Sequence, residues 1–170
     1  MVLNSIRMLS VTETWLVEGV FSSFVDIPGY KFFRSDSPSG IRKHGVGVYV
    51  CELIVAVPVA VEVPNVLVLR LVDFGIYVVS VFRPPSNSVE ENERLLSFIF
   101  DFSLGKTVLL LGDFNLPTLK WYQTGLPDGY IAPLDQKFSD VFSISGLRQW
   151  VHEPTFLPSG NILDLVFTTC

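Results

Sequence analysis

The chain has 170 residues, of which 49% are hydrophobic and 17% are charged, and its formal net charge is −5. This composition is that of a globular domain rather than a disordered segment, and the length suits one domain with a sizeable core. The charge excludes a strongly basic nucleic-acid binder, so any contact with DNA must come from local groups of side chains. An ordinary acidic soluble protein explains the same charge equally well.

The cysteines and the distribution of apolar residues indicate the cellular compartment and argue against a membrane-spanning segment. Cys51 and Cys170 show no metal-type spacing, so we expect no disulfide framework and a reducing, intracellular compartment. Charged residues and prolines interrupt the apolar stretch 46–82, and no run reaches the ~18 residues that a membrane-spanning helix needs. Residues 1–9 are too few and too polar for a signal peptide. We therefore expect no membrane partner.

The first 45 residues predict two short strands and a long loop. Apolar residues from Ile6 onwards predict a strand that runs into the polar residues of the segment ETWL. The stretch Asp26–Gly45 is rich in Pro, Gly and Ser, and it predicts a loop with a short strand at Tyr30–Phe33.

The central apolar region predicts three strands. The β-branched run Val46–Val57 predicts one strand that is buried on both faces. Residues 66–72 and 76–82 flank Asp73-Phe74-Gly75, and this arrangement predicts a hairpin.

Helices are predicted only in the C-terminal half. The elements there are, in chain order, a helix at Ser88–Phe102, a strand at Thr107–Asn115, a helix at Leu134–Gly146 and a strand at Ile162–Thr168. Ser88 and Glu91 have the spacing of a capping box, and Gly146 is a suitable helix end. Because strands outnumber helices, we expect an α/β layered domain with helices outside central sheets.

The segment LLLGDFN at 109–115 ends a predicted core strand in polar groups. Gly112 allows a sharp turn, Asp113 can accept a proton or bind a cation, and Asn115 can orient an oxyanion. A simple β-turn is the alternative, because Gly, Asp and Asn are turn-forming residues.

Three more residues are candidates for chemistry. Glu13 leaves a strand in the segment VTETWL, although a lone Glu at a strand end is commonly just solvated. Asp164 puts a charge into an apolar strand, so it either faces outward or pairs with a site. Arg83 in VFRPPSN could hold a phosphate next to two rigid prolines, or it could be a surface charge at a turn.

Each signal is weak alone, but their order along the chain is specific. The segments are ETWL at 13–16, HGVGVYV at 44–50, VFRPPSN at 81–87, LLLGDFNLP at 109–117, GLRQWVHEPTF at 146–156 and NILDLVFT at 161–168. From Leu9 to Thr168 this series resembles the endonuclease/exonuclease/phosphatase superfamily. More narrowly, it is similar to the apurinic-type endonuclease domain of non-LTR retrotransposons.

The resemblance implies a fold and a chemistry. The fold is a four-layered α/β sandwich, in which two packed mixed β-sheets are flanked by helices, here incomplete at both ends. The chemistry is phosphodiester cleavage by activated water with Mg²⁺, or alternatively Mn²⁺, as cofactor. Glu13 resembles the metal ligand, Asp113 the residue that positions or deprotonates the water, and Asn115 a residue that holds the scissile phosphate. Asp164 resembles the Asp that orients a catalytic His.

The chain departs from the family pattern in three places. An N-terminal strand with a supporting Asn and a C-terminal Ser-Asp-His are not in the chain, and Phe82 stands where the family has a Tyr before Arg-Pro-Pro. His44 and His152 lie in the wrong segments to replace the missing His. We expect low or no activity, since losing one electrostatic contributor can cost on the order of 10²–10³ in rate. We also expect exposed sheet edges that favour aggregation.

Three functions remain open at this point. The leading one is a DNA-nicking endonuclease domain of a retrotransposon reading frame, weakened or inactive in this copy. Double-stranded DNA would be its partner, a reverse transcriptase would follow on the same chain in an intact element, and its location would be nuclear if it is functional. The candidate DNA-backbone contacts are Arg34, Arg42, Lys43, His44 and Arg83, with solvated loop charge as the alternative. The other functions are a non-catalytic remnant of this domain and a superfamily phosphatase.

Overall fold

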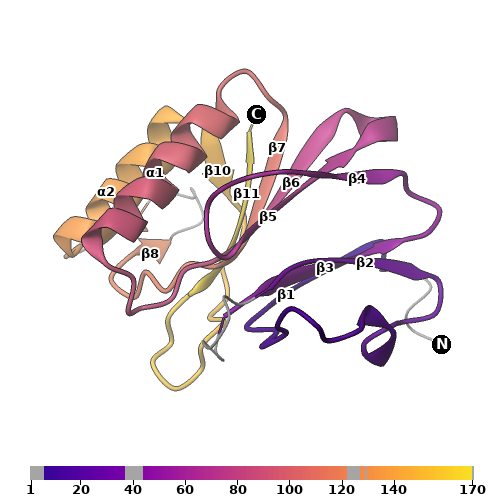
Figure 1. The fold of residues 1–170 in the computed structure, drawn as a ribbon. Helices are drawn as coiled ribbons and strands as arrows, with labels where there is room; N and C mark the ends of the chain where they lie inside the picture. Colours follow the sequence, from indigo (N-terminus) through magenta and orange to yellow (C-terminus); the bar gives the residue numbers. More distant parts are fainter. Residues whose placement is uncertain (1–5, 37–43, 122–126, 129, 170) are drawn as a thin grey trace. The chain divides into compact units, whose positions relative to one another are not determined.

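The computed structural model describes residues 6–36, 44–121, 127–128 and 130–169. The chain divides into two compact units, unit 1 (Met1–Phe82) and unit 2 (Arg83–Cys170), whose elements are labelled in Figure 1. No helix in the described ranges has the length and apolar character needed to cross a bilayer. The prediction of one domain over the whole chain stays a prediction.

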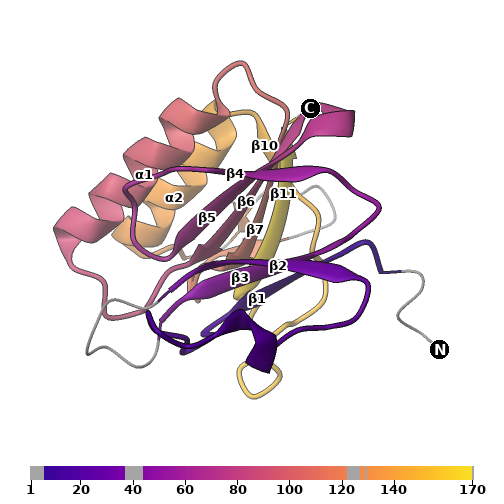
Figure 2. The same cartoon turned by 45° about the vertical axis from the view of Figure 1, so that its right-hand side comes forward.

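Unit 1 is built from two antiparallel sheets that pack face to face. Its strands are β1 (Met8–Thr12), β2 (Tyr30–Ser35), β3 (Val46–Cys51), β4 (Ala56–Val59), β5 (Val66–Leu71) and β6 (Ile76–Phe82), with short 3₁₀ turns at Ser22–Phe24 and Val72–Phe74. One sheet has the order β1-β3-β2, and in the other β5 pairs with both β4 and β6. The two layers are separate in Figure 2, and the hydroxyl groups of Ser10 and Ser80 bridge them at 2.8 Å.

The prediction of one strand over Val46–Val57 is wrong. The strand β3 ends at Cys51, where the N–H of Ile54 donates to the Cys51 carbonyl at 2.9 Å, and β4 then starts in the second sheet. Val46, Val48 and Val50 are fully buried, as expected of a strand covered on both faces, but Leu53 is 80% exposed. The apolar run continues through the turn, and for this reason hydrophobicity alone did not indicate the break.

The strand β4 is the exposed edge of its sheet and contains a proline. The N–H of Val72 donates to the Val55 carbonyl, so every second residue of β4 is hydrogen-bonded to β5. The backbone N–H and C=O groups of the residues between them, Ala56 and Pro58, face away from β5. Pro58 has no N–H to offer on that outer side, which is where proline is tolerated in a sheet.

A close approach on the outer face of the three-stranded sheet requires a glycine. A Cβ on Gly47 would lie 2.4 Å from the ring of Phe32, and that ring stacks on Tyr49 at 4.3 Å between centroids. The Tyr49 hydroxyl donates to the Val25 carbonyl at 2.6 Å and so fastens the segment that follows β1. Burial raises the pKa of the Tyr49 hydroxyl above its ordinary value, and the negative charge of Asp26 adds to this effect.

Unit 2 packs two helices against one antiparallel sheet. Its elements are α1 (Val89–Ser103), β7 (Val108–Asp113), β8 (Lys120–Trp121), β9 (Pro127–Asp128), α2 (Pro133–Ile144), β10 (Leu147–Gln149) and β11 (Asp164–Thr169). The strand β11 pairs with β10 on one side and with β7 on the other, while β8 and β9 form a small ladder. The two helices lie side by side (Figure 1).

The core between these helices and the sheet is aromatic. Phe142 of α2 packs on Phe167 of β11 with 4.2 Å between ring centroids, and Phe114 meets both rings edge-on at 5.6 and 5.9 Å. Trp121 packs against Phe167 at 5.8 Å. Burying each such ring contributes roughly 1.5–3 kcal/mol. Phe114 is therefore anchored in the core, and it separates Asp113 from Asn115 in the chain.

The helix predictions are confirmed. Ser88 caps α1: its hydroxyl accepts the N–H of Glu91 at 3.2 Å, and Glu91 accepts the N–H of Ser88 at 2.7 Å. The helix α2 ends before Gly146, which has a positive φ of 67°. The α/β class is confirmed as well, since the chain combines two antiparallel layers in unit 1 with helices on a sheet in unit 2.

Candidate active site

Two of the predicted acidic residues face each other in unit 2. Asp113 ends β7, Asp164 begins β11, and the two are direct partners in the antiparallel ladder. The N–H of Phe114 donates to the Leu163 carbonyl at 2.9 Å, so Asp113 and Asp164 form the adjacent non-hydrogen-bonded pair. Cα atoms in such a pair are about 4.5 Å apart, and both side chains leave the same face of the sheet. The ladder thus brings together two residues that lie far apart in the sequence.

Like charges placed directly opposite each other destabilise a sheet. Asp113 is half-buried, whereas Asp164 is exposed, as in the outward-facing alternative considered for this residue. The start of β11 is held by Thr155, whose hydroxyl oxygen accepts the N–H groups of Leu163 and Asp164 at 2.9 and 3.0 Å. A cation near the two carboxylates would relieve their repulsion.

The residues after β7 form the turn that the sequence also allowed. Gly112 has a φ of 141° and Asn115 a φ of 48°, both in the region that favours glycine, although Asn tolerates it. The Asp113 carboxylate accepts the N–H of Asn115 at 3.1 Å, which is an Asx turn. The Asn115 side-chain amide donates to the Arg83 carbonyl at 3.0 Å. The turn and the candidate site are therefore one feature.

Arg83 is the centre around which this turn is built. It is only 4% exposed, and its backbone N–H donates to the Asp113 carbonyl at 2.8 Å. Its guanidinium Nη1 donates to the carbonyls of Phe114 and Asn115 at 3.0 and 2.9 Å. Burial lowers the pKa of this guanidinium, while the carboxylates of Asp135 and Asp113 raise it. An arginine stays charged even so, which makes Arg83 a buried cation beneath the turn.

A polar group on α1 completes the surroundings of Arg83. Asn92 is 3% exposed; its side-chain oxygen accepts from Arg83 Nε at 2.8 Å, and its amide donates to the Ser88 carbonyl at 2.9 Å. On another side, the guanidinium lies 5.4 Å from the centre of the Phe138 ring. These contacts give Arg83 a scaffolding role. Because Nε and Nη1 bond within the protein and the side chain is buried, these contacts do not bear on the predicted phosphate contact, which stays a prediction.

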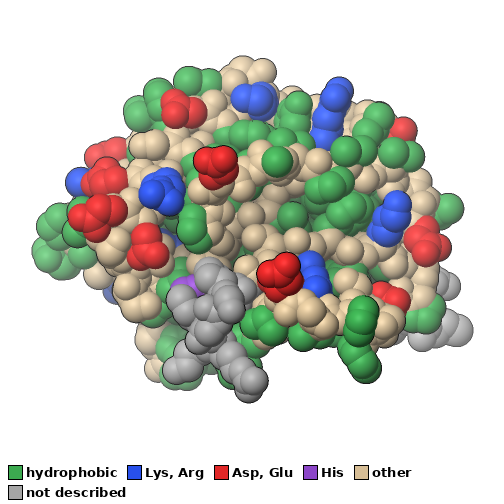
Figure 3. Space-filling view, in the orientation of Figure 1, with side chains coloured by type: hydrophobic (Ala, Val, Ile, Leu, Met, Phe, Trp, Pro, Cys, Tyr) green, Lys and Arg blue, Asp and Glu red, His purple; other side chains and the backbone are tan. Residues whose placement is uncertain are grey.

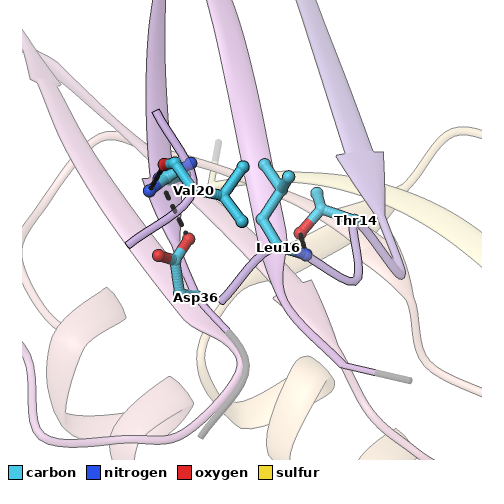
Figure 4. Close-up of polar contacts among 5 residues, drawn as sticks. Thr14, Leu16, Val20 and Asp36 are labelled. Atoms are coloured by element: carbon cyan, nitrogen blue, oxygen red, sulfur yellow. Dashed lines mark hydrogen bonds and ion pairs between the residues drawn. The ribbon is translucent and has the colours of Figure 1, made fainter. Parts of the chain in front are cut away.

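Glu13 belongs to unit 1, where it is exposed in a strained turn just after β1. Glu13 has a φ of 51° and Trp15 a φ of 55°, which is uncommon for residues with a Cβ. Two backbone bonds hold the turn: the N–H of Thr14 donates to the Gly45 carbonyl at 3.2 Å, and that of Trp15 to the His44 carbonyl at 3.0 Å. The Thr14 hydroxyl also accepts the N–H of Leu16 at 3.4 Å (Figure 4). Strained backbone of this kind is concentrated at functional sites.

Among the other candidate DNA contacts, Arg34 is already bonded within the protein, and two more candidates are not among the described residues. Arg34 donates to the Val20 carbonyl at 2.6 Å and pairs with Asp36 at 3.0 Å without hydrogen-bond geometry (Figure 4). Arg42 and Lys43 lie outside the described residues. On the face drawn in Figure 3, positive and negative side chains are interspersed and no broad basic patch is visible. This mixed surface agrees with the acidic composition.

The donor chemistry suits a hard divalent cation that takes few protein ligands. Among the described residues, no three His, Cys, Asp or Glu side chains gather into a group that could hold a metal ion. Mg²⁺ commonly binds through only one or two carboxylates and completes its shell with waters and substrate phosphates. The carboxylate pair in unit 2 fits that minimal requirement, and Glu13 in unit 1 separately offers a carboxylate of the same kind.

Sequence reasoning missed the buried polar residues that support the site. Asn92 occupies a position on the α1 stripe that is otherwise formed by Leu95, Leu96 and Ile99, and all four are buried. Asp135 stands on the corresponding stripe of α2 and accepts from the Thr118 N–H at 3.0 Å and hydroxyl at 2.6 Å. A polar residue at an apolar stripe position was the signal that could have found them.

The fold is similar to that of solved apurinic-type endonuclease domains. Over 84% of its length, the chain superimposes on the endonuclease domain of TRAS1, a telomere-specific non-LTR retrotransposon, with a TM-score of 0.63, 18% identity and 66% of that chain covered. For the AP endonuclease LMAP from Leishmania major the TM-score is 0.70 at 12% identity, over 96% of this chain and 69% of that one. For the catalytic domain of Xenopus laevis APE2 the TM-score is 0.59 at 14% identity, over 97% and 74%.

The sequence itself identifies the family. A family model described as endonuclease–reverse transcriptase matches residues 76–170, which is more than half of the chain, and the chain therefore belongs to that family. The resemblance to the endonuclease/exonuclease/phosphatase superfamily is confirmed. No curated protein matches the sequence. The chain spans about two thirds of the TRAS1 endonuclease domain.

Proposed function

We propose that this chain is a metal-dependent phosphodiesterase domain that nicks double-stranded DNA. The observation that carries the proposal is the facing pair Asp113 and Asp164 at the joined ends of β7 and β11, with Asn115 on the adjoining turn. The endonuclease–reverse transcriptase family of the chain supports it. Carboxylates on a rigid strand end are suited to repeated positioning of a small reactant such as water.

Each residue has a separate role in this proposal. Asp113 accepts a proton from the attacking water or orients it, since its carboxylate is fixed by the bond from Asn115. Asn115 contacts a phosphate oxygen of the scissile group. Asp164, exposed at the start of β11, places a second carboxylate opposite Asp113. Arg83 acts only through the turn that it supports.

The cofactor of the proposed reaction is Mg²⁺, with Mn²⁺ as an alternative. When bound, such an ion polarises the phosphoryl oxygen and stabilises the leaving oxygen. Glu13 is the proposed ligand, because its carboxylate is exposed and its backbone is fixed in the strained turn after β1. In an intact element, a reverse transcriptase domain would follow on the same chain, as the name of the family suggests.

We expect the rate of this copy to be low. Phe82 stands where the family pattern has a tyrosine before Arg-Pro-Pro, and it is 3% exposed with its ring edge-on to His44 at 6.0 Å. A phenyl ring cannot donate a hydrogen bond to a phosphate. This observation also keeps the non-catalytic remnant as the second candidate function.

Plasmid nicking tests the proposal. Purified chain is incubated at high concentration with supercoiled DNA and Mg²⁺ or Mn²⁺, and nicked circles are quantified against an EDTA control. We expect slow, metal-dependent nicking that falls by on the order of 10²-fold or more in Asp113→Ala. Asp101→Ala, at an exposed acidic residue of α1, is the matched control and should keep the activity.

The outcomes separate the candidate functions. Nicking that persists in Asp113→Ala would remove the central assignment. A folded wild-type chain that never nicks, even with Mn²⁺, would make the remnant the correct conclusion. Release of phosphate from an inositol phosphate without nicking would indicate a superfamily phosphatase.

A further inference from the structure

A buried asparagine lies beneath the segment that holds the Glu13 turn. Asn65 immediately precedes β5, is 6% exposed and has a positive φ of 57°. We propose that Asn65 is a positioning residue for Glu13 and that it acts through His44 and Gly45. The link to metal binding rests on the proposed function of Glu13, whereas the positioning itself does not.

Both ends of the Asn65 side chain are engaged with the same short segment. Its Oδ1 accepts the N–H of Gly45 at 3.2 Å, which identifies the other end of the amide as the donor. That donor, Nδ2, lies 3.2 Å from Nδ1 of His44. The Asn65 carbonyl accepts the N–H of Phe82 at 2.9 Å, so β6 holds the asparagine in place. Asn65 thus ties His44 and Gly45 to a core strand.

The same two residues then hold the Glu13 turn through their carbonyl groups. Gly45 accepts the N–H of Thr14 and His44 accepts that of Trp15, on the residues directly after Glu13. Glu13 and Trp15 both have left-handed backbone, which these bonds must stabilise against relaxation. The carboxylate of Glu13 is exposed, and its location therefore depends on the backbone that carries it.

Residue 65 allows a clean test because of its backbone conformation. Glycine adopts a positive φ freely and aspartate tolerates it, so neither substitution adds strain. Asn65→Gly removes both side-chain contacts, leaving the buried N–H of Gly45 without its acceptor. Asn65→Asp keeps an acceptor for that N–H and serves as the conservative variant. Ser80→Ala is the matched control, since Ser80 is fully buried in unit 1 and its hydroxyl bonds only to that of Ser10 among the interactions described.

The first readout is the rate of amide hydrogen exchange at Thr14 and Trp15, which is measured by NMR on the full chain. We expect exchange on the order of tenfold faster in Asn65→Gly, because the loss of one buried hydrogen bond changes a local opening equilibrium by about a factor of ten. Asn65→Asp should fall between Asn65→Gly and the wild type, and Ser80→Ala should leave both amides unchanged. Equal exchange in Asn65→Gly and wild type, or an equal rise in Ser80→Ala, would overturn the proposal.

The second readout is Mn²⁺ affinity, measured by electron paramagnetic resonance without DNA. We expect weaker Mn²⁺ binding in Asn65→Gly, partial recovery in Asn65→Asp and no change in Ser80→Ala. Glu13→Gln, tested in parallel, reports on the proposed function separately. If Glu13→Gln leaves Mn²⁺ binding intact, the metal role of Glu13 fails, whereas faster exchange in Asn65→Gly still supports the positioning role.

Discussion

The turns that carry Asp113 and Glu13 present acidic side chains just beyond a strand, but they are held by different means. The Asp113 turn wraps around the buried cation of Arg83 and is anchored in an aromatic core by Phe114. The Glu13 turn lies at the surface, with left-handed backbone and two main-chain bonds to the segment that Asn65 supports. The Asp113 turn is therefore fixed by buried side chains beneath it, whereas the Glu13 turn is fixed by the backbone of a neighbouring segment.

The difference predicts how each turn responds to change. A buried charged network cannot lose one member without leaving another polar group unpaired in a medium of low dielectric. A surface turn can replace a lost bond with water, so its loss affects position more than global stability. Substitutions around Asp113 should therefore destabilise the chain, and those around Glu13 should chiefly alter local order.

Arg83→Met should have the largest effect. It removes the donors to Asn92, Phe114 and Asn115 and leaves the buried carboxylate of Asp135 without its nearby cation. We expect a loss of roughly 3–5 kcal/mol in the free energy of unfolding, measured by urea denaturation. Arg70→Met, at an exposed position of β5, is the control and should cost little. A loss below about 1 kcal/mol in Arg83→Met would show that the network does not stabilise the turn.

Asn92→Ala should come next. It leaves Arg83 Nε without its acceptor but retains the charge and the bonds to the turn. The expected loss is about 1–3 kcal/mol, the usual cost of a buried group without a partner. Ser97→Ala on the exposed face of α1 is the comparison, and thermal unfolding of both variants is the measurement. Similar melting temperatures for the two would argue against the importance of Asn92.

Thr155→Val tests the other carboxylate of the pair. The two N–H groups of Leu163 and Asp164 lose their acceptor, although water can reach this exposed loop. We expect a loss of only about 0.5–1.5 kcal/mol, together with NMR chemical-shift changes at Asp164 and its partner Asp113. Thr107→Val, at another exposed threonine, should leave both resonances in place.

Tyr49→Phe should have the smallest effect: it loses the single bond to the Val25 carbonyl at neutral pH, and it changes the pH dependence of stability in alkali. Because the pKa of Tyr49 is raised in the folded chain, its contribution is complete below the unfolded pKa of about 10 and declines as the pH rises towards the folded value. The phenylalanine variant should therefore lose stability less steeply above about pH 10. Urea unfolding across this range is the measurement, with Tyr130→Phe at an 82% exposed tyrosine as the control.

The sequence was most informative where local rules determine the structure. The capping box of Ser88 and Glu91 and the glycine end of α2 require only neighbouring residues, and both predictions are confirmed. The turn at Asp113 was also recognisable, because its glycine, aspartate and asparagine act over adjacent positions. In each case the forces act within a few residues, so the local sequence is sufficient.

Features that depend on distant residues could not be found in this way. The pairing of Asp113 with Asp164 is a property of the ladder register, and the burial of Arg83 depends on Asn92 and the aromatic core. The break between β3 and β4 lies in a continuous apolar run, where sheet packing rather than composition decides the direction of the chain. The proposed roles of Glu13 and Asn115 in chemistry remain predictions.

Pro58 restricts how far another strand can pair with the free edge of β4. An added strand would meet an outward N–H at Ala56 but none at Pro58, so its ladder would lack one donor there. Pairing with a strand of another molecule is therefore disfavoured at this position of the edge, while the expectation that exposed edges promote aggregation stays a prediction.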